Sequence, residues 1–328
     1  IDVPFTYFTM DQETAKKLLV EGGTFVFLGV PQETQFGLDM QCWNTDEDFR
    51  GVKMIPPGLH YVHYSGVSKG TGDVSPRSGF MHYFHKKEFL VKMWDKNTED
   101  MSRDEIAQES IQRLKDNLLN LDRHLAPYPY EIWQKWKLLS SQITESGVIR
   151  ASVELLSMTD EDRPRGESAG QSDAKRAKRI TREEKEDSML PNLKPAPELQ
   201  FAFLCFLIGH SLDAFEHWKN LVILMCSCDD AIHKYRSVFF HFIRTIEVQI
   251  DEMPEDFLAD IVMNKNLVYK KLREFFRTAY VSKVDGRLLT MIERFKDNLT
   301  DKLQWDFTGL DADEEDERPV IVKLDQTE

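Results

Sequence analysis

A rigid turn between two extended segments, within residues 49–64, constrains the fold of this chain more than any other feature. Pro56 and Pro57 fix two successive φ angles and lack amide hydrogens, and Gly58 can adopt a positive φ. A sharp turn must therefore separate the segments on either side. Residues 59–64 alternate between two sets of side chains, which is the period of a strand with different surroundings on its two faces. We interpret Pro56, Pro57 and Gly58 as a structural turn in a binding domain, since no catalytic pattern accompanies them.

Length and charge favour a two-domain protein with a protein partner. The 328 residues can form two domains that each bury a core, and 41% hydrophobic and 30% charged residues are typical of globular proteins. The formal net charge of −14 disfavours a broad contact with nucleic-acid phosphates, so we expect no direct RNA binding. The four cysteines indicate reduced thiols of a cytosolic or nuclear protein. The most apolar run, residues 199–208, is too short to span a membrane. Nothing in the sequence favours a homo-oligomer.

The first domain, residues 1–156, is predicted to be a β-sandwich or barrel with flanking helices. A capping box formed by Thr9 and Gln12 predicts a helix that ends at Gly22, and a second box formed by Ser102 and Glu105 predicts a long helix packed across the sheet. A further helix is expected after Pro127-Tyr128-Pro129-Tyr130. The predicted strands are residues 24–30, 59–65, 79–84 and 89–94.

Residues 157–197 form a predicted disordered charged linker, because so few apolar residues cannot offset the entropy of ordering. Within it, Lys175, Arg176, Lys178 and Arg179 predict a nuclear-import patch, with a solvated charge run as the equal alternative. Ser168 and Ser172 are candidate phosphorylation sites. We accordingly expect the protein in cytoplasm and nucleus.

The second domain, residues 198–305, is predicted to be entirely helical. Residues 199–208 are apolar except at Gln200, which indicates a central buried helix. An amphipathic helix with Phe215, Trp218 and Met225 follows, and the two form a helical hairpin like those of α-solenoids. The remaining predicted helices are residues 231–250, 254–263, 268–280 and 288–303, the last with a stripe formed by Leu288, Ile292, Phe295, Leu299 and Leu303.

The last segment, residues 306–328, is an acidic spacer followed by a β-prone tail. Residues 311–317 are almost all acidic, and the tail that follows consists of Val320, Ile321, Val322, Lys323 and Leu324. Such a segment suits strand addition to the sheet edge of a partner, where main-chain hydrogen bonds provide affinity. The alternative is that the tail folds back onto the first domain or frays.

No pattern in the sequence predicts catalysis, a metal or a cofactor. The pairs His60 and His63, and His82 and His85, are spaced by three on predicted strands and so point to opposite faces. Residues 66–72 lack the order of a phosphate-binding loop and indicate a hairpin tip. Adjacent Glu216 and His217 fit a solvated helix face better than an acid–base pair. We therefore expect a protein that is not an enzyme.

Several motifs in order along the chain are similar to the Aar-two splicing-factor family. The first is Gly-Val-Lys-Met-Ile-Pro-Pro-Gly at residues 51–58, and the most specific is Glu-Leu-Gln-Phe-Ala-Phe-Leu-Cys-Phe-Leu-Ile-Gly at residues 198–209. Four further segments resemble the family in order and place: residues 127–130, 214–219 and 305–307, and the terminal strand. Members of the family have a longer linker before the motif at residues 198–209. This chain departs from the family in its shorter linker.

The resemblance implies a β domain followed by a helical domain of the VHS class, in an assembly factor of the U5 small nuclear ribonucleoprotein (U5 snRNP). Members bind the RNase H-like and Jab1/MPN domains of the scaffold protein Prp-eight, partly by adding the tail to a partner sheet, and delay binding of the helicase Brr-two. Phosphorylation is implied to regulate release. The alternative function is a VHS-like helical adaptor in protein trafficking.

Overall fold

The computed structural model describes residues 10–67, 74–147, 195–254, 257, 267–282, 284–303 and 305–307. The chain divides into two compact units. Unit 1 comprises Ile1–Lys178 and Ala196–Trp218, and unit 2 comprises Arg179–Pro195 and Lys219–Glu328. A strand-rich region is followed by a helical region, so the predicted α+β class with two kinds of domain is confirmed. The predicted domain boundaries and the predicted linker stay predictions, because residues 148–194 lie outside the described residues.

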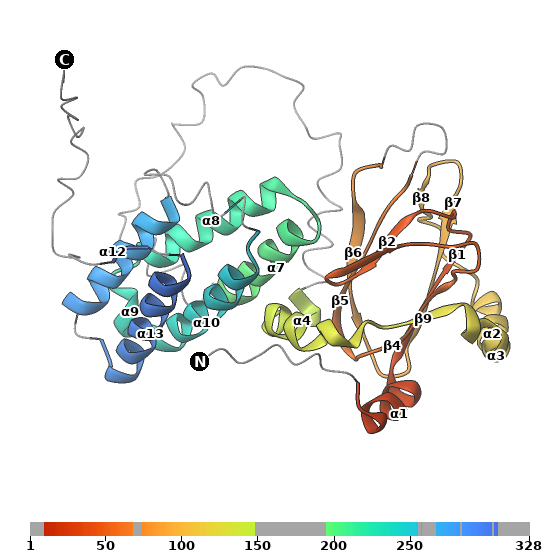
Figure 1. Ribbon diagram of the computed structural model, residues 1–328, viewed down its shortest axis with the longest axis horizontal. Coiled ribbons are helices and arrows are strands. Elements are labelled where there is room, and N and C mark those ends of the chain that lie inside the picture. Colours follow the sequence, from red (N-terminus) through yellow and green to blue (C-terminus); the bar gives the residue numbers. More distant parts are fainter. Residues whose placement is uncertain are drawn as a thin grey trace, which may run out of the picture. The chain divides into compact units, whose positions relative to one another are not determined.

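Unit 1 contains a sandwich of two sheets (Figure 1). The five-stranded sheet has the order β8-β7-β1-β4-β9, and the four-stranded sheet has the order β3-β2-β5-β6. In chain order the strands are β1 (Gly23–Leu28), β2 (Gln35–Leu38), β3 (Gln41–Asn44), β4 (Gly51–Ile55), β5 (Gly58–Ser65), β6 (Ser78–Phe84), β7 (Phe89–Asp95), β8 (Asp100–Met101) and β9 (Leu125–Pro127). Strand β1 pairs antiparallel with β4 and parallel with β7.

The core follows from the alternation of side chains along the strands. Phe25 and Phe27 of β1 point into the sandwich, where they pack with Phe36 and Tyr64 from the other sheet. Val26 lies on the opposite face of β1, in a second cluster with Val91, Leu121 and Leu125. One strand therefore serves two cores, because successive residues point to opposite faces of a sheet.

The helices that flank the sandwich begin at residues other than the predicted capping boxes. Helix α1 (Gln12–Glu21) is capped by Asp11, whose carboxylate accepts a hydrogen bond from the Thr14 amide at 2.7 Å. Helix α2 (Gln108–Asp116) begins after Ala107 without a side-chain cap, so the predicted box at Ser102 and Glu105 is wrong. The Ser102 hydroxyl accepts a hydrogen bond from the Asp104 amide in a local turn instead.

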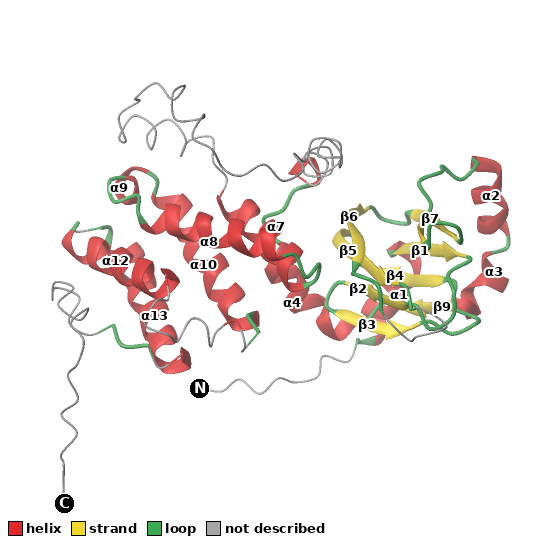
Figure 2. Ribbon diagram, turned by 90° about the horizontal axis from the view of Figure 1, so that it is seen from above, coloured by secondary structure: helices red, strands yellow, loops and turns green. Residues whose placement is uncertain are grey.

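The long helix predicted after Ser102 is in fact two helices that cover the outer face of the five-stranded sheet. Helix α2 is followed by α3 (Leu118–Leu121), with the break at Asn117. Leu121 packs against Val26 and Val91, so the predicted packing across the sheet is confirmed. Both views of Figures 1 and 2 show α2 and α3 beside the five-stranded sheet.

The helical region follows the predicted order with two changes. Helix α7 (Pro195–Leu207) and α8 (Leu212–Cys226) are the predicted hairpin, and the division between the units falls within α8. The predicted helix over residues 231–250 is split at Tyr235 into α9 (Ala231–Lys234) and α10 (Arg236–Glu252). Helices α12 (Leu267–Val281) and α13 (Gly286–Leu303) complete unit 2. The helix predicted over residues 254–263 lies almost wholly outside the described residues.

Two properties of the helices bear on the predictions from the sequence. The stripe of α13 is buried at Leu288, Ile292, Phe295 and Leu299, as its spacing predicts. Among the helices that the structure describes, none combines the length and the apolar character that a membrane crossing needs.

Candidate functional site

The Pro-Pro-Gly turn joins β4 to β5 and encloses a buried polar group. Strand β4 ends at Ile55 and β5 begins at Gly58, whose φ of 142° is a conformation that side chains larger than hydrogen rarely adopt. The carbonyl oxygen of Pro56 lies 2.7 Å from Nε2 of His60, whose side chain is 0% exposed. The turn therefore positions a hydrogen-bond acceptor inside the sandwich.

His60 also contacts Asp39, and the Asp39 carboxylate meets three groups from two segments, strand β5 and the residues after β9. Nδ1 of His60 lies 2.7 Å from Oδ2 of Asp39, and the hydroxyl of Tyr128 donates to the same oxygen at 2.7 Å. The amide of Tyr61 donates to Oδ1 at 2.9 Å. Both ring nitrogens of His60 therefore lie within hydrogen-bond distance of an oxygen, one of Asp39 and one of Pro56. Burial, and then the Asp39 charge, raise the pKa of Tyr128 well above its usual range, so its hydroxyl keeps the proton that it donates.

Aromatic rings from the Pro-Tyr-Pro-Tyr segment and the following helix α4 (Trp133–Ser140) seal this network. The Trp133 ring stacks on His60 with 5.5 Å between centroids, and Tyr128 meets the same imidazole edge-on at 5.3 Å. The indole of Trp136 donates to the carbonyl of Leu59 at 2.7 Å. The network is fully enclosed, so it holds α4 on the sheet and offers no opening for a substrate.

Helix α4 in turn holds α7 within unit 1. The side chain of Gln200, which is 2% exposed, accepts a hydrogen bond from the amide of Gln142 at 2.7 Å and donates to the carbonyl of Leu138 at 3.0 Å. The one polar residue in the apolar run thus satisfies backbone groups at the end of α4. Because the buried side-chain amide of Gln200 has hydrogen-bond partners for both its oxygen and its nitrogen, it favours one specific packing of α7 against α4.

The other end of α7 rests on the four-stranded sheet. Arg77 donates to the carbonyl of Ile208 at 2.8 Å, which places a positive charge at the C-terminus of the helix. A Cβ at Gly209 would lie 2.5 Å from the carbonyl oxygen of Cys205 and 2.9 Å from the hydroxyl of Tyr61, so glycine permits this close approach. Three stretches far apart in the sequence, around Pro56, Tyr128 and Gln200, therefore meet in one buried joint, which we call the α4–α7 joint.

Comparison with known proteins assigns these stretches to a family. The AAR2 N-terminal domain matches residues 21–153, and the AAR2 C-terminal repeat region matches residues 183–308. The chain belongs to the AAR2 family. The curated protein AAR2 homolog of Homo sapiens is 32% identical over 380 residues, which cover 96% of this chain and 97% of that protein. The homologs of Mus musculus and Caenorhabditis elegans are 32% and 31% identical, over 96% and 87% of this chain and 97% and 95% of those proteins.

The compared length of 380 residues exceeds the 328 residues of this chain, so the AAR2 relatives carry residues without a counterpart here. A longer linker in the family would account for this difference, and the location of the extra residues stays a prediction. Three of the motifs that carry the resemblance, residues 51–58, 127–130 and 198–209, lie within the described residues of unit 1. They contribute to the α4–α7 joint from the turn before β5, from the segment before α4 and from α7.

The last motif that the structure describes packs against α12. Trp305 and Phe307 are 6% and 5% exposed. The ring of Trp305 lies 5.5 Å from that of Tyr269, and the ring of Phe307 lies 4.9 Å from that of Phe276. This motif too is structural, because both of its rings pack within unit 2.

The other predicted site residues lie outside the described residues. They are the tail residues Val320, Ile321, Val322, Lys323 and Leu324, the basic residues Lys175, Arg176, Lys178 and Arg179, and the serines Ser168 and Ser172. Their roles stay predictions. The Asp39 network, in contrast, was missed by reasoning from the sequence, because Asp39 lies 21 residues before His60 and no spacing rule links the two. The one local signal is the two-residue connection Asp39-Met40, which is typical of a hairpin turn, but the four-residue runs on either side show too little periodicity to identify strands.

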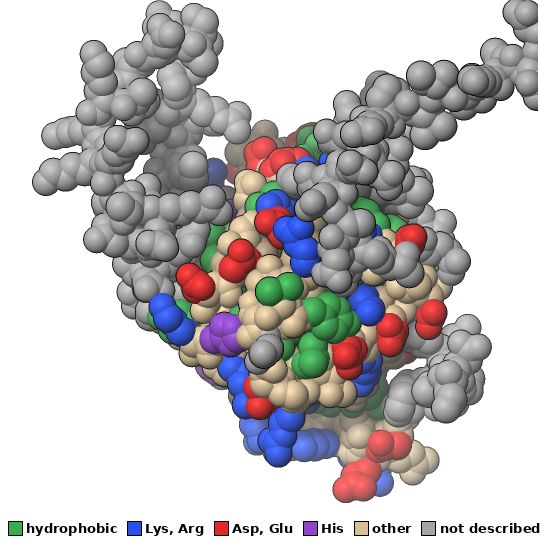
Figure 3. Space-filling view, turned by 90° about the vertical axis from the view of Figure 1, so that its left-hand side faces the viewer, with side chains coloured by type: hydrophobic (Ala, Val, Ile, Leu, Met, Phe, Trp, Pro, Cys, Tyr) green, Lys and Arg blue, Asp and Glu red, His purple; other side chains and the backbone are tan. Residues whose placement is uncertain are grey.

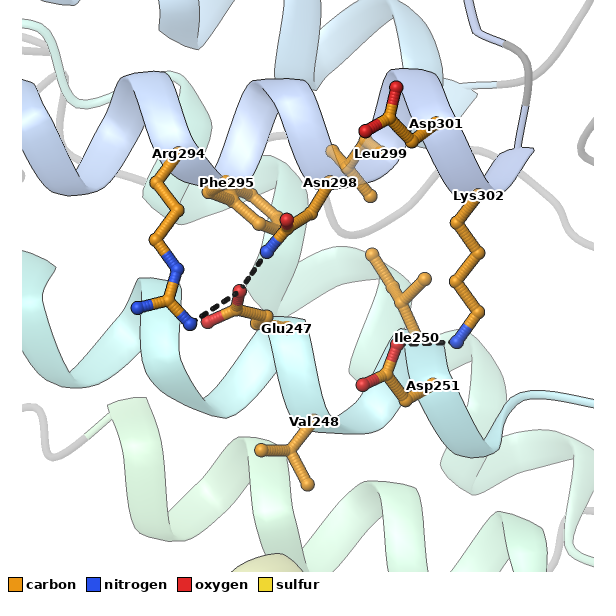
Figure 4. A pocket seen from close by; sticks show the side chains of 10 residues that line it. All are labelled: Glu247, Val248, Ile250, Asp251, Arg294, Phe295, Asn298, Leu299, Asp301 and Lys302. Carbon is orange, nitrogen blue, oxygen red and sulfur yellow. Dashed lines mark hydrogen bonds and ion pairs between the residues drawn. The ribbon is translucent and has the colours of Figure 1, made fainter. Parts of the chain in front are cut away.

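A groove of about 550 Å³ lies between α10 and α13 in unit 2 (Figure 4). Its floor contains the buried side chains of Phe295 and Leu299. Polar groups bridge it: Glu247 pairs with Arg294 at 3.9 Å and accepts a hydrogen bond from Asn298, and a further ion pair joins Asp251 and Lys302. Because the charges of the two helices satisfy each other, the groove resembles a packing seam rather than a ligand site.

The titratable groups offer little reactive chemistry. Burial raises the pKa of the Cys205 thiol to about 12 and raises that of Cys226 further, which disfavours thiolates. His82 and His85 contact different carboxylates, those of Glu88 and Glu145. The described part of the chain holds no group of three side chains arranged to bind a metal ion.

Charged and hydrophobic side chains are interspersed on the face of the molecule drawn in Figure 3. Exposed apolar residues occur in small groups elsewhere as well, for example Leu19 and Val20 on α1, which are 66% and 62% exposed. Isolated exposed hydrophobic residues are normal on protein surfaces, so these pairs alone do not indicate a partner.

Proposed function

We propose that this chain is a non-enzymatic assembly factor of the U5 snRNP that binds the scaffold protein Prp-eight in spliceosome assembly. The observation that carries the proposal is membership of the AAR2 family over 96% of the chain, in both of its matched regions. Enclosed polar groups and thiols with raised pKa values agree with a role in binding rather than in catalysis.

The mechanism that we propose uses two contacts. The helical and β-rich parts dock on the RNase H-like domain of Prp-eight, while residues Val320 to Leu324 add a strand to the Jab1/MPN domain. Strand addition suits a short β-prone segment because main-chain hydrogen bonds supply most of its affinity. Occupancy of both domains would delay binding of the helicase Brr-two. The α4–α7 joint supports this scheme, since a rigid unit 1 loses little conformational entropy on docking.

A pull-down with purified Jab1/MPN domain tests the strand contact. Deletion of residues 319–328 should weaken binding at least tenfold. A sharper variant is Val322→Pro, because proline removes an amide donor and is not tolerated inside a paired strand. Lys323→Ala is the matched control and should bind with nearly unchanged affinity, since it keeps the main chain. Equal affinity of the deletion variant and the full chain would contradict the strand contact.

Localisation in cytoplasm and nucleus is part of the proposal. Replacing Lys175, Arg176, Lys178 and Arg179 by alanine should reduce nuclear accumulation of a fluorescent fusion. An unchanged nuclear fraction would show that the basic run is only a solvated segment. Phosphorylation of Ser168 and Ser172 would be read by mass spectrometry of the same fusion, and full occupancy in Prp-eight-bound protein would contradict a role in release.

A further inference from the structure

The four-stranded sheet of unit 1 ends in an open strand edge. Strand β6 is the last in the order β3-β2-β5-β6, and β5 is its one paired neighbour among the strands that the structure describes (Figure 1). The carbonyl of Tyr61 in β5 accepts a hydrogen bond from the Asp39 amide, on the β2 side. Tyr61 and Met81 are therefore a non-hydrogen-bonded pair, so the amide and the carbonyl of Met81 point away from β5. The same holds two residues away, at Gly79 and Tyr83.

We call Gly79, Met81 and Tyr83 the β6 edge. Within the described part of the chain, the backbone hydrogen bonds of β6 run to β5, and no turn or side chain bonds to these outward groups. Soluble proteins normally protect such an edge with lysine, proline or a bulge. Strand β6, with the sequence Ser-Gly-Phe-Met-His-Tyr-Phe, contains no lysine, carboxylate or proline, and its register with β5 is regular. The edge is thus suited to accept another strand.

A cation lies beside the β6 edge on the inner face of the sheet. Phe80 packs against Phe25 inside the sandwich, and the ammonium of Lys92, from β7, lies 5.9 Å from the centre of the Phe80 ring. The ring attracts the ammonium, but Lys92 is half-buried and forms no ion pair with a described residue. A strand added to β6 would place alternate side chains on this face, next to Lys92. A carboxylate at that position would form a charge-assisted hydrogen bond.

The carboxylates around β6 are already engaged with other groups: Glu88 with His82, Glu145 with His85, and Asp100 with Tyr64. Arg77, just before β6, donates to a helix carbonyl and likewise has no ion pair among the described residues. The surroundings of the β6 edge therefore favour an acidic occupant.

We propose that the β6 edge is a docking site for an extended segment of a partner protein, which adds to the sheet as a fifth strand and places a carboxylate next to Lys92. Outward main-chain groups supply the hydrogen bonds, and the half-buried side chains of Met81 and Tyr83 supply apolar contact on the outer face. This contact is separate from the one proposed for the tail, and it does not depend on the proposed function.

A second copy of the chain fits the edge less well. Two β6 strands that pair about Met81 would bring both Lys92 ammonium groups to the same face of the joined sheet. Neither strand contains a carboxylate that could offset these charges. An acidic strand of a different protein avoids this repulsion.

Selection of phage-displayed random peptides of about 12 residues on the purified full chain, at about 50 mM NaCl where screening is weak, tests the site. Met81→Pro is the decisive variant, because proline removes the outward amide but no hydrogen bond to β5. Met81→Ala is the matched control, since it keeps the amide. A selected peptide that contains Asp or Glu should lose about tenfold in affinity for Met81→Pro and less than about threefold for Met81→Ala.

Charge reversal tests the carboxylate independently of the main chain. Lys92→Glu should weaken binding of the same peptide about fivefold, whereas Lys96→Glu, an equal change of charge at an exposed position, should leave it nearly unchanged. Hydrogen exchange at the Gly79, Met81 and Tyr83 amides should slow when the peptide binds, and this readout decides the case if Met81→Pro does not fold.

Peptides whose affinity is unchanged in Met81→Pro or in Lys92→Glu would overturn the proposal, as would the absence of any selected peptide that protects these amides. Light scattering of the full chain alone covers the other occupant. A dimer that Met81→Pro abolishes would assign the edge to a second copy and overturn the proposal as well.

Discussion

Asp39 and His60 pair inside the β sandwich, with 2.7 Å between Oδ2 of Asp39 and Nδ1 of His60 and with neither side chain exposed. The pair lies behind the Pro-Pro-Gly turn, and His60 reaches the carbonyl of Pro56 with its other nitrogen. The turn, the pair and the stacked Trp133 thus form one unit, which explains why a block without catalytic chemistry is so distinctive in the sequence.

Asp39→Asn should destabilise the protein by about 1–3 kcal/mol, because an amide cannot accept all the donors that the carboxylate accepts. Asparagine tolerates the positive φ of 56° at this position, so the backbone adds little to the loss. The free energy of unfolding by urea, followed by tryptophan fluorescence, gives the measurement. Exposed Asp46→Asn is the control, and a loss as small as that of the control would show that the pair adds nothing to stability.

Gln200→Leu should loosen the α4–α7 joint. Leucine suits an apolar helix, but it leaves the amide of Gln142 and the carbonyl of Leu138 without partners, at a cost of about 1–3 kcal/mol. Hydrogen exchange at the Gln142 amide should accelerate accordingly. The exposed substitution Gln134→Leu should leave that exchange unchanged, and equal protection in both variants would contradict this account of the joint.

His63 predicts an acid-sensitive stability. Burial, followed by the charge of Arg77, lowers the pKa of His63 from about 6.5 to about 4, and its Nδ1 is buried without a partner. Above pH 6.5 the ring is neutral in both states. As the pH falls from 6.5 to 4, the unfolded chain gains a proton that the folded chain refuses, so stability falls by up to about 1.4 kcal/mol per pH unit.

The variant His63→Leu should remove this contribution. Its free energy of unfolding should depend less steeply on pH between 6.5 and 4 than that of the unmodified chain. His241→Gln, a change at an exposed position, should keep the original slope. Parallel curves for His63→Leu and the unmodified chain would contradict the assignment of this acid sensitivity to His63.

Gly37→Ala should destabilise unit 1 by more than about 2 kcal/mol, since the new methyl group would overlap the ring of His63 and the carbonyl of Gln41. The Cβ would lie 2.0 Å from Cε1 of His63 and 2.7 Å from that carbonyl oxygen. Gly286→Ala, where nothing lies within 4 Å, should be neutral or slightly stabilising. A thermal unfolding midpoint for Gly37→Ala equal to that of Gly286→Ala would contradict the packing.

Features with a local cause could be predicted from the sequence. Two prolines and a glycine produce a turn wherever they occur, and an apolar run such as residues 199–208 must be buried. The partners of buried polar groups could not be predicted, because Asp39 with Tyr128 and Gln200 with Gln142 are joined only by the tertiary fold. Helix starts were wrong where several polar residues compete for the cap, as Asp11 does near Thr9.

The same distinction between local and tertiary causes applies to the candidate site. The tail was proposed as a site because its composition differs from its surroundings. The Asp39 network could not be proposed, because its residues meet only in the tertiary fold. The short strands β2 and β3 escaped prediction, since four residues carry too little periodicity.

Affinity purification of the full chain from cells, followed by mass spectrometry, is the sharpest test of the proposed function. Prp-eight should co-purify in near-stoichiometric amount with other U5 proteins, while Brr-two should be strongly depleted. A purification that contains no Prp-eight, or that contains Prp-eight and Brr-two in equal amounts, would contradict the claim that this chain holds Prp-eight in a precursor of the U5 snRNP.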